Sequence, residues 1–117
     1  MCAMPIRTVD KVAVEARAAS FKTRSIKKES KRQGLLMVAS MIDLTTLEGK
    51  DSAAKVQSLC RKALLPDASL PHVPHVAAVC VYPRWVELAC ESVAGSGVKV
   101  ASVATAFPSG QVDLKTK

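Results

Sequence analysis

The sequence contains few aromatic residues and no long apolar segment. Its 117 residues include two phenylalanines, one tyrosine and one tryptophan. The sequence contains no run of about 18 uncharged apolar residues, which is the length that a membrane-spanning helix requires. The first seven residues lack the apolar stretch of a secretory signal, so we expect a soluble cytoplasmic protein without membrane contact. The alternative is a mitochondrial transit peptide, although Asp10, Glu15 and Glu29 make this region more acidic than such peptides are.

The cysteines match no known pattern of a zinc site. They are Cys2, Cys60, Cys80 and Cys90. Three of them fall inside apolar helix or strand patterns, and the compartment that we expect is reducing. We therefore expect all four to be reduced core residues.

Two other short motifs give no reason to expect a cofactor or a metal. His72 and His75 flank Pro74 in a loop, and together with Cys80 they lack a fourth ligand at a recognised spacing. The segment 95–97, Gly-Ser-Gly, precedes a strand, whereas the glycines of a dinucleotide-binding motif precede a helix. Neither a phosphate-binding loop nor a nucleophile elbow occurs in the sequence.

Positive charge is concentrated at the N-terminal end. The chain has a net charge of +7, and nine basic against three acidic residues give +6 before Leu35. Alanine and valine recur at helical spacing between Val12 and Ala19, so we expect residues 1–34 to form a basic, helical extension. Such a segment could bind nucleic acid through its positive charge. However, Phe21 is its single aromatic residue, so the segment offers almost no ring on which a base could stack. We therefore favour a solvated helix and expect no nucleic acid partner.

Three segments have the pattern of buried strands, each followed by a polar or proline-marked loop. They are residues 42–47, 77–83 and 100–108. Strands this apolar must be covered on both faces, which is typical of a parallel sheet with crossover helices. The sequence therefore predicts an α/β fold with one strand-helix unit repeated three times.

Helical patterns separate these strands. Asp51 is the expected N-cap of the first helix, which Pro66 ends. Its apolar face consists of Ala54, Val56, Leu59, Cys60, Ala63 and Leu64. The apolar stripe of the second helix consists of Trp85, Leu88, Ala89 and Val93. We expect Gly95 or Gly97 to adopt the left-handed conformation that ends this helix. A further helix is expected to begin near Gln111 and to be cut short at Lys117.

The same strand segments resemble the deoxyribose-phosphate aldolase family. The resemblance rests on the Asp-Leu-Thr-Thr-Leu run at 43–47, the Ala-Val-Cys-Val-Tyr-Pro run at 78–83 and the Val-Ala-Ser-Val-Ala run at 100–104 with Phe-Pro-Ser-Gly at 107–110. It spans residues 35–117. The resemblance implies a class I aldolase on a (β/α)8 barrel, which cleaves 2-deoxyribose 5-phosphate to glyceraldehyde 3-phosphate and acetaldehyde through a lysine Schiff base.

The length fits only part of such a barrel. A (β/α)8 barrel needs about 250 residues, so residues 35–117 supply the first three of eight strand-helix units of a TIM-barrel aldolase domain. An open three-stranded sheet leaves apolar surface in contact with water. We therefore expect the isolated chain to be poorly stable and inactive. A complete enzyme would bind a sugar phosphate and could form a homo-oligomer.

The candidate pocket residues are Asp43, Thr45, Thr46 and Cys80, because catalysis in such barrels occupies the carboxyl ends of the strands. A carboxylate between two apolar residues is costly to bury. Asp43 is therefore expected either to relay protons or simply to accept bonds that fix the strand end. Cys80 is expected to be a packing residue with a raised pKa, although the resemblance allows it to line the pocket.

No lysine of the chain fits the Schiff-base role. Lys99 begins a strand, at the end of the barrel opposite to catalysis, and Lys115 and Lys117 are solvated. The family's Schiff-base lysine, relay lysine and acid-base aspartate lie in motifs that this sequence does not contain. Its phosphate site, expected after the seventh and eighth strands, is also missing. The rival interpretation is a non-catalytic module whose basic segment binds an acidic partner or RNA.

Overall fold

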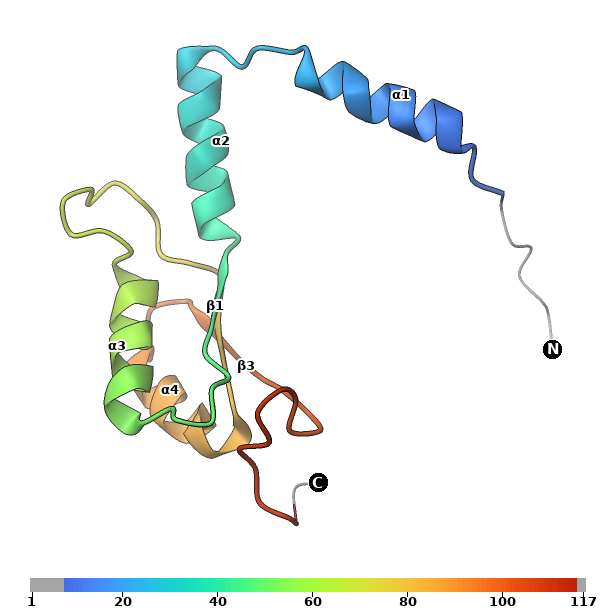
Figure 1. Cartoon of the computed structure of the whole chain (residues 1–117). Helices are drawn as coiled ribbons and strands as arrows, with labels where there is room; N and C mark the ends of the chain where they lie inside the picture. Colours follow the sequence, from blue (N-terminus) through green and yellow to red (C-terminus); the bar gives the residue numbers. More distant parts are fainter. Residues whose placement is uncertain (1–7, 116–117) are drawn as a thin grey trace. The chain divides into compact units, whose positions relative to one another are not determined.

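The computed structural model describes residues 8–115, and their contacts divide the chain into two units at Lys31 and Arg32 (Figure 1). The helices and strands are α1 (Lys11–Lys22), α2 (Lys28–Ser40), β1 (Asp43–Thr45), α3 (Ala53–Leu64), β2 (Ala78–Val81), the 3-10 helix η1 (Pro83–Trp85), α4 (Val86–Ser92) and β3 (Lys99–Ser102). Cys2 and Lys117 lie outside the described residues.

The first unit contains α1, as the helical spacing of its alanines and valines predicts. The Asp10 side chain caps the helix by accepting a hydrogen bond of 3.1 Å from the Ala13 amide. None of the residues of α1 is buried. Its one aromatic ring, Phe21, lies beneath the guanidinium groups of Arg17 and Arg24, at 6.0 and 5.2 Å from the ring centroid.

The helix α2 leads directly into the first strand. It runs without interruption from Lys28 to Ser40, and therefore crosses the position at residue 34 where the composition changes. Met41 and Ile42 connect it to β1, and the Ile42 carbonyl already accepts a hydrogen bond of 2.9 Å from the Ala77 amide. The backbone is thus aligned with β2 just before β1 begins.

The three strands form one parallel sheet in the order β1-β2-β3. Asp43 pairs with Ala78 and Thr45 with Cys80 between β1 and β2, and Cys80 pairs with Ala101 in β3. The predicted parallel α/β arrangement is therefore confirmed for the described part of the chain, as an open sheet of three strands. A closed barrel is not formed by residues 8–115.

Helices α3 and α4 lie beside one another on the same side of the sheet (Figure 1). Because side chains alternate along a strand, Val79 and Val81 point to this covered side and are fully buried. The core that they form also contains Val56, Cys60, Ala63, Val76, Ala89, Val93 and Val98. The other side of the sheet presents Ala78, Cys80 and Ala101, which are half-buried.

The third strand is shorter than the sequence predicts. The apolar run 100–108 was expected to be strand, but β3 ends at Ser102. Thr105 and Ala106 have φ angles of 67° and 64°, in the left-handed region that extended backbone does not use. The prediction of a long strand is wrong because this apolar segment folds back as a loop, in which Ala106 is buried.

Two details of the helices also differ from the sequence prediction. Ser52, not Asp51, is the N-cap of α3, and its hydroxyl accepts a hydrogen bond of 3.4 Å from the Lys55 amide. No helix begins at Gln111, since residues 111–115 form turns and irregular backbone. The left-handed residues after α4 are confirmed, with φ of 75° at Gly95 and 87° at Gly97.

Candidate functional site

Three of the four candidate residues lie together on the open side of the sheet. Asp43 and Thr45 are two residues apart in β1, and they therefore point to the same side. Thr45 is the register partner of Cys80, and its hydroxyl forms a hydrogen bond with the Cys80 sulfur. This brings a carboxylate, a hydroxyl and a thiol to one face of two neighbouring strands.

Asp43 is exposed, so its carboxylate does not incur the desolvation cost that its apolar sequence neighbours suggest. Within residues 8–115 its side chain accepts no hydrogen bond from Thr45, Thr46 or a neighbouring amide. Its charge acts instead on Cys80. Burial, followed by the negative charge of Asp43, raises the pKa of the Cys80 thiol, and the hydrogen bond from Thr45 opposes the shift.

The cysteines differ in exposure, although all were expected in the core. Cys60 is fully buried, Cys80 is half-buried and Cys90 is exposed, each as a free thiol. Burial raises the pKa of Cys60, and a hydrogen bond with Ser92 opposes the shift. The core prediction is therefore wrong for Cys90, because this position of α4 borders an open hollow beside the start of β3 and stays exposed to solvent.

Thr46 is separated from the other candidates. It is buried, and its hydroxyl donates a hydrogen bond of 2.7 Å to the Asp51 carboxylate in the loop that leads to α3. The Thr46 amide donates to the Cys80 carbonyl at 3.0 Å, which prolongs the β1-β2 pairing by one bond. Adjacent residues of a strand point to opposite sides, and this places Thr45 and Thr46 in different surroundings.

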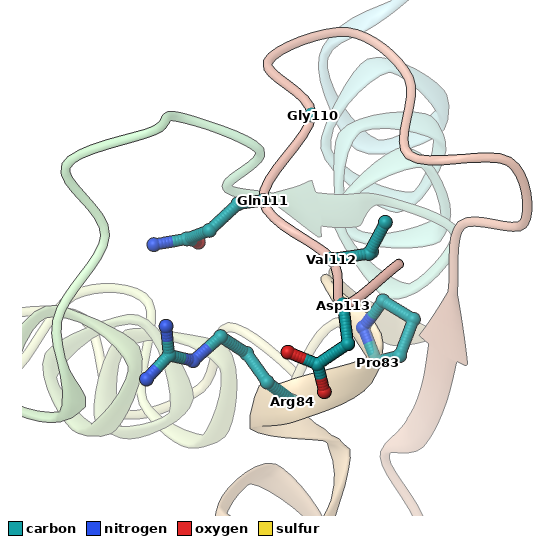
Figure 2. Close-up of a pocket in the computed structure, with 6 residues that line it drawn as sticks. All are labelled: Pro83, Arg84, Gly110, Gln111, Val112 and Asp113. Atoms are coloured by element: carbon teal, nitrogen blue, oxygen red, sulfur yellow. The ribbon is translucent and has the colours of Figure 1, made fainter. Parts of the chain in front are cut away.

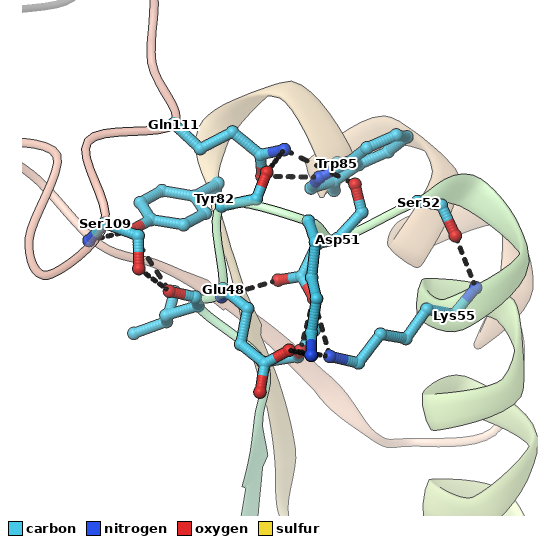
Figure 3. Close-up of polar contacts among 12 residues, drawn as sticks. Glu48, Asp51, Ser52, Lys55, Tyr82, Trp85, Ser109 and Gln111 are labelled. Atoms are coloured by element: carbon cyan, nitrogen blue, oxygen red, sulfur yellow. Dashed lines mark hydrogen bonds and ion pairs between the residues drawn. The ribbon is translucent and has the colours of Figure 1, made fainter.

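The charged side chains of Glu48, Asp51 and Lys55 form a network between the loop after β1 and the first turn of α3 (Figure 3). The Asp51 side chain is fully buried and accepts bonds from the Glu48 amide at 2.9 Å and the Lys55 ammonium at 3.0 Å. Lys55 also donates to Glu48 at 2.6 Å. The sequence pattern predicted Asp51 as a helix cap, whereas in the structure the loop brings its carboxylate to Thr46, the Glu48 amide and Lys55.

The network shifts the pKa values of its members. Burial acts to raise the pKa of Asp51, but hydrogen bonds from Thr46, Lys55 and the Glu48 amide outweigh it and lower the pKa. The hydrogen bond from Lys55, followed by the charge of Lys50, lowers the pKa of Glu48. Bonds to Glu48 and Asp51 raise the pKa of Lys55. All three groups are therefore charged at neutral pH.

A second polar cluster, at the carboxyl ends of the strands, joins the loops that follow β1 and β3 (Figure 3). Tyr82 follows β2 and is fully buried. Its hydroxyl accepts a hydrogen bond of 2.7 Å from the Ser109 amide and lies 3.3 Å from the Leu47 carbonyl and 3.5 Å from the Ala106 carbonyl. The Ser109 hydroxyl donates to Leu47 at 2.8 Å. No local sequence pattern indicates this role of Tyr82, because its hydrogen bonds span 24 to 35 residues.

Gln111 extends the same connection. Its amide nitrogen donates to the carbonyls of Gly49 and Asp51 at 3.1 and 3.3 Å. Its amide oxygen accepts a bond of 3.2 Å from the Trp85 indole. Because one side chain reaches three segments, the loops after β1, β2 and β3 form one connected rim. In parallel α/β folds, this edge of the sheet is where ligands bind.

The rim contains a cavity of about 380 Å³ beside β1. Its lining includes Thr45, Thr46, Lys55 and Lys62. A solvent-accessible space therefore lies beside two of the four candidate residues. Asp43 and Cys80 do not line this cavity, so the four residues share an edge of the sheet but no single pocket.

The remaining sequence candidates do not form a site in the described part of the chain. Lys99 is exposed at the first position of β3, and Lys115 is exposed after the rim. His75 uses its Nδ1 atom in a contact of 2.9 Å with the Val76 carbonyl. No three metal-ligating side chains gather within residues 8–115. In that same range, no helix has both the length and the apolar character needed to span a bilayer.

Comparison with known proteins points to one enzyme family. The chain is 44% identical over 123 residues to deoxyribose-phosphate aldolase of Mus musculus and 42% identical over 123 residues to that of Homo sapiens. Each match covers 93% of this chain. This chain is a homologue of the deoxyribose-phosphate aldolases. The putative deoxyribose-phosphate aldolase of Caenorhabditis elegans is also similar, at 38% identity over 87% of the chain.

The similarity to the aldolases covers only part of those proteins. The chain spans 38% of the length of the mouse and human aldolases and 34% of the nematode protein. No protein-family model matches the chain. The aldolase relationship therefore rests on the curated relatives, and it extends over a partial length of each of them.

Proposed function

We propose that this chain is a segment of a deoxyribose-phosphate aldolase and supplies one wall of its reaction pocket. The observation that carries this proposal is the homology over 93% of the chain, together with a parallel sheet whose open side presents Asp43, Thr45 and Cys80. In a complete (β/α)8 barrel the side of the strands opposite to the helices is the interior. These three residues would then face the substrate.

The chemistry proposed for the complete enzyme is cleavage of 2-deoxyribose 5-phosphate through a lysine imine. Such a lysine must be unprotonated near neutral pH, which requires an apolar pocket or a nearby cation. Lys99 is exposed at the first position of β3, which in such barrels is the end of the strand opposite to catalysis. The imine lysine is therefore proposed to lie outside this chain, and the 117 residues alone are proposed to be inactive.

The wall residues are proposed to have different roles. Asp43 has a solvent-accessible carboxylate that accepts no bond from its neighbours within residues 8–115, so it can take or give a proton on the open side. Thr45 and Cys80 would shape the wall, as a bonded pair in register. Thr46 would act indirectly, since its hydroxyl is bound to Asp51 and holds the loop after β1.

The native mass of the protein tests this proposal first. An antibody raised against residues 42–47 would detect the protein in extracts of its source cells. A barrel of about 250 residues corresponds to about 27 kDa, and a species of that mass or larger would support the proposal, while a single species at 12.4 kDa would contradict it. The isolated chain provides a second test, because borohydride in the presence of acetaldehyde should trap no imine on it.

One observation favours a second candidate, a basic module that binds an acidic macromolecule such as RNA. Residues 8–31 contain seven basic and three acidic residues, and α1 has no buried side chain. Phe21 holds two guanidinium groups over its ring. Binding of single-stranded RNA that weakens steeply between about 50 and 200 mM salt would support this function. Loss of that binding in a chain lacking residues 1–31 is also expected.

A further inference from the structure

A second cavity of about 380 Å³ lies at the same edge of the sheet, beside η1 (Figure 2). Pro83 and Arg84 of η1 form one wall, and the segment 110–113 that follows β3 forms the other. None of the four candidate residues Asp43, Thr45, Thr46 and Cys80 lines this cavity, although Gln111 of the rim does. Its lining brings one guanidinium and one carboxylate, those of the exposed residues Arg84 and Asp113, to a single hollow that is open to solvent.

The Arg84 guanidinium is held in place by an aromatic ring. It lies 4.6 Å from the centroid of Trp85, whose indole donates a hydrogen bond of 3.2 Å to Gln111. Gln111 is in turn bound to Gly49 at 3.1 Å. Stacking on an anchored ring orients the planar guanidinium before any ligand arrives, which reduces the entropy that binding costs.

Within residues 8–115 the guanidinium of Arg84 forms no ion pair, and its donors remain available to a ligand. Asp113 lines the same cavity and is exposed, with its carboxylate on the side that faces Arg84 (Figure 2). The two charges are too far apart to form an ion pair within 4.0 Å. A ligand that lies between them can therefore contact both.

The chemistry of these two groups defines the ligand. A guanidinium donates paired hydrogen bonds to phosphate or carboxylate oxygens. A carboxylate repels a bare anion, but it accepts a hydrogen bond from a hydroxyl group. We propose that this cavity binds a small oxyanion that carries a hydroxyl group, such as a hydroxylated phosphate monoester. Arg84 binds the oxyanion and the Asp113 carboxylate accepts a hydrogen bond from the hydroxyl group.

This inference is independent of the aldolase proposal, because it rests on the groups that line or border the cavity. The chain contains a single tryptophan, Trp85, which lies against Arg84, so its fluorescence should respond to a ligand bound at this site. The purified 117-residue chain would be titrated with glycerol 3-phosphate at low temperature and constant ionic strength. Inorganic phosphate and glycerol serve as the partial ligands. Phosphorus NMR line broadening gives a second readout that does not depend on Trp85.

The expected result is a saturable change with glycerol 3-phosphate, a weaker one with inorganic phosphate and none with glycerol. Arg84→Gln should weaken binding of glycerol 3-phosphate by about tenfold or more. Arg84→Lys should weaken it by less, because lysine keeps the positive charge but cannot donate the paired hydrogen bonds of a guanidinium group. Arg61→Gln removes the same charge from an exposed site on α3. This control should bind like the unmodified chain.

Asp113→Asn gives the most specific test, because two effects of opposite sign are expected. Inorganic phosphate should bind more tightly when the repelling carboxylate is gone. The preference for glycerol 3-phosphate over phosphate should fall by about threefold or more. The proposal is overturned by the absence of a saturable response, by unchanged binding in Arg84→Gln, by an unchanged preference in Asp113→Asn, or by tighter binding of a zwitterion such as β-alanine.

Discussion

The Thr46 hydroxyl donates a hydrogen bond of 2.7 Å to the buried carboxylate of Asp51, five residues further along the chain. This bond fixes the turn that leads from β1 to α3. It also separates Thr46 from Thr45, whose side chain lies on the open side of the sheet with Cys80. Two adjacent threonines thus have different tasks, one in holding a loop and one in forming a surface.

Replacing Asp51 by Asn should lower the free energy of unfolding by about 2–3 kcal/mol at pH 7. The Asp51 carboxylate accepts a charge-assisted bond from Lys55 and a bond from the buried Thr46 hydroxyl. In asparagine an NH2 group, which only donates hydrogen bonds, replaces one of the two accepting oxygens, and the negative charge is lost. Urea denaturation measures the change. Asp43→Asn, at an exposed carboxylate, is the matched control and should change stability by less than about 0.5 kcal/mol. Equal losses in the two variants would contradict the assigned role of Asp51.

The same carboxylate should make stability depend on pH. The pKa of Asp51 in the folded chain is below its ordinary value of 3.8, so the unfolded state binds the proton first. The contribution of Asp51 is therefore fully present above pH 3.8 and is lost as the pH falls further, through the folded-state pKa. Unfolding curves recorded between neutral pH and pH 3 should show this loss, and Asp51→Asn should reduce it.

Replacing Tyr82 by Phe should loosen the loop that follows β3. The hydroxyl accepts the bond from the Ser109 amide, which would be left without its acceptor, at a cost of about 1–3 kcal/mol. Hydrogen exchange should become faster in segment 103–110 and remain unchanged in α3. Ser102→Ala removes a hydroxyl whose bond reaches only its neighbour Val103, and it serves as control. Unaltered exchange in Tyr82→Phe would refute the connected rim.

Introducing a serine should lower the free energy of unfolding much more on the covered side of the sheet than on the open side. Val79 is fully buried beneath α3 and α4, while Ala78 is half-buried on the open side. Val79→Ser should destabilise the chain by about 2–4 kcal/mol, through lost apolar burial and an unpaired hydroxyl. Ala78→Ser should cost less than about 1 kcal/mol. Comparable losses measured by circular dichroism would show that both sides are covered.

The three described cysteines should be alkylated at different rates. Burial raises the pKa of Cys60 and of Cys80, which lowers the fraction of reactive thiolate, whereas Cys90 is exposed. Iodoacetamide at neutral pH should modify Cys90 first and Cys60 last, by about tenfold or more between them. Peptide mapping by mass spectrometry over time gives the order. Modification of Cys60 as fast as Cys90 would mean that the core opens readily.

Much of the fold could be predicted from the local pattern of the sequence. Apolar runs at 42–47 and 77–83 and helical stripes between them gave a parallel α/β arrangement, and β1, β2, α3 and α4 follow it. The prediction failed at 103–108, where an apolar segment folds back under the rim instead of continuing as strand. An apolar pattern indicates burial, and it does not distinguish a strand from a buried loop.

The candidate site was only partly predictable for the same reason. The strand ends indicated Asp43, Thr45, Thr46 and Cys80, but the pleat divides these residues between two sides of the sheet. Tyr82, Ser109 and Gln111 have no local signature, since their partners lie 24 to 62 residues away.

The sequence by itself determined the order of the helices and strands, the concentration of basic residues near the N-terminus and the similarity to aldolases, because these depend on residue identity and short-range spacing. Only the tertiary structure decided which side of the sheet each candidate residue faces. It also joined the three loops into one rim and brought Arg84 and Asp113 to a common cavity. Such contacts depend on how distant segments pack, and hydrogen bonds that close loops of tens of residues leave no periodic trace in the sequence.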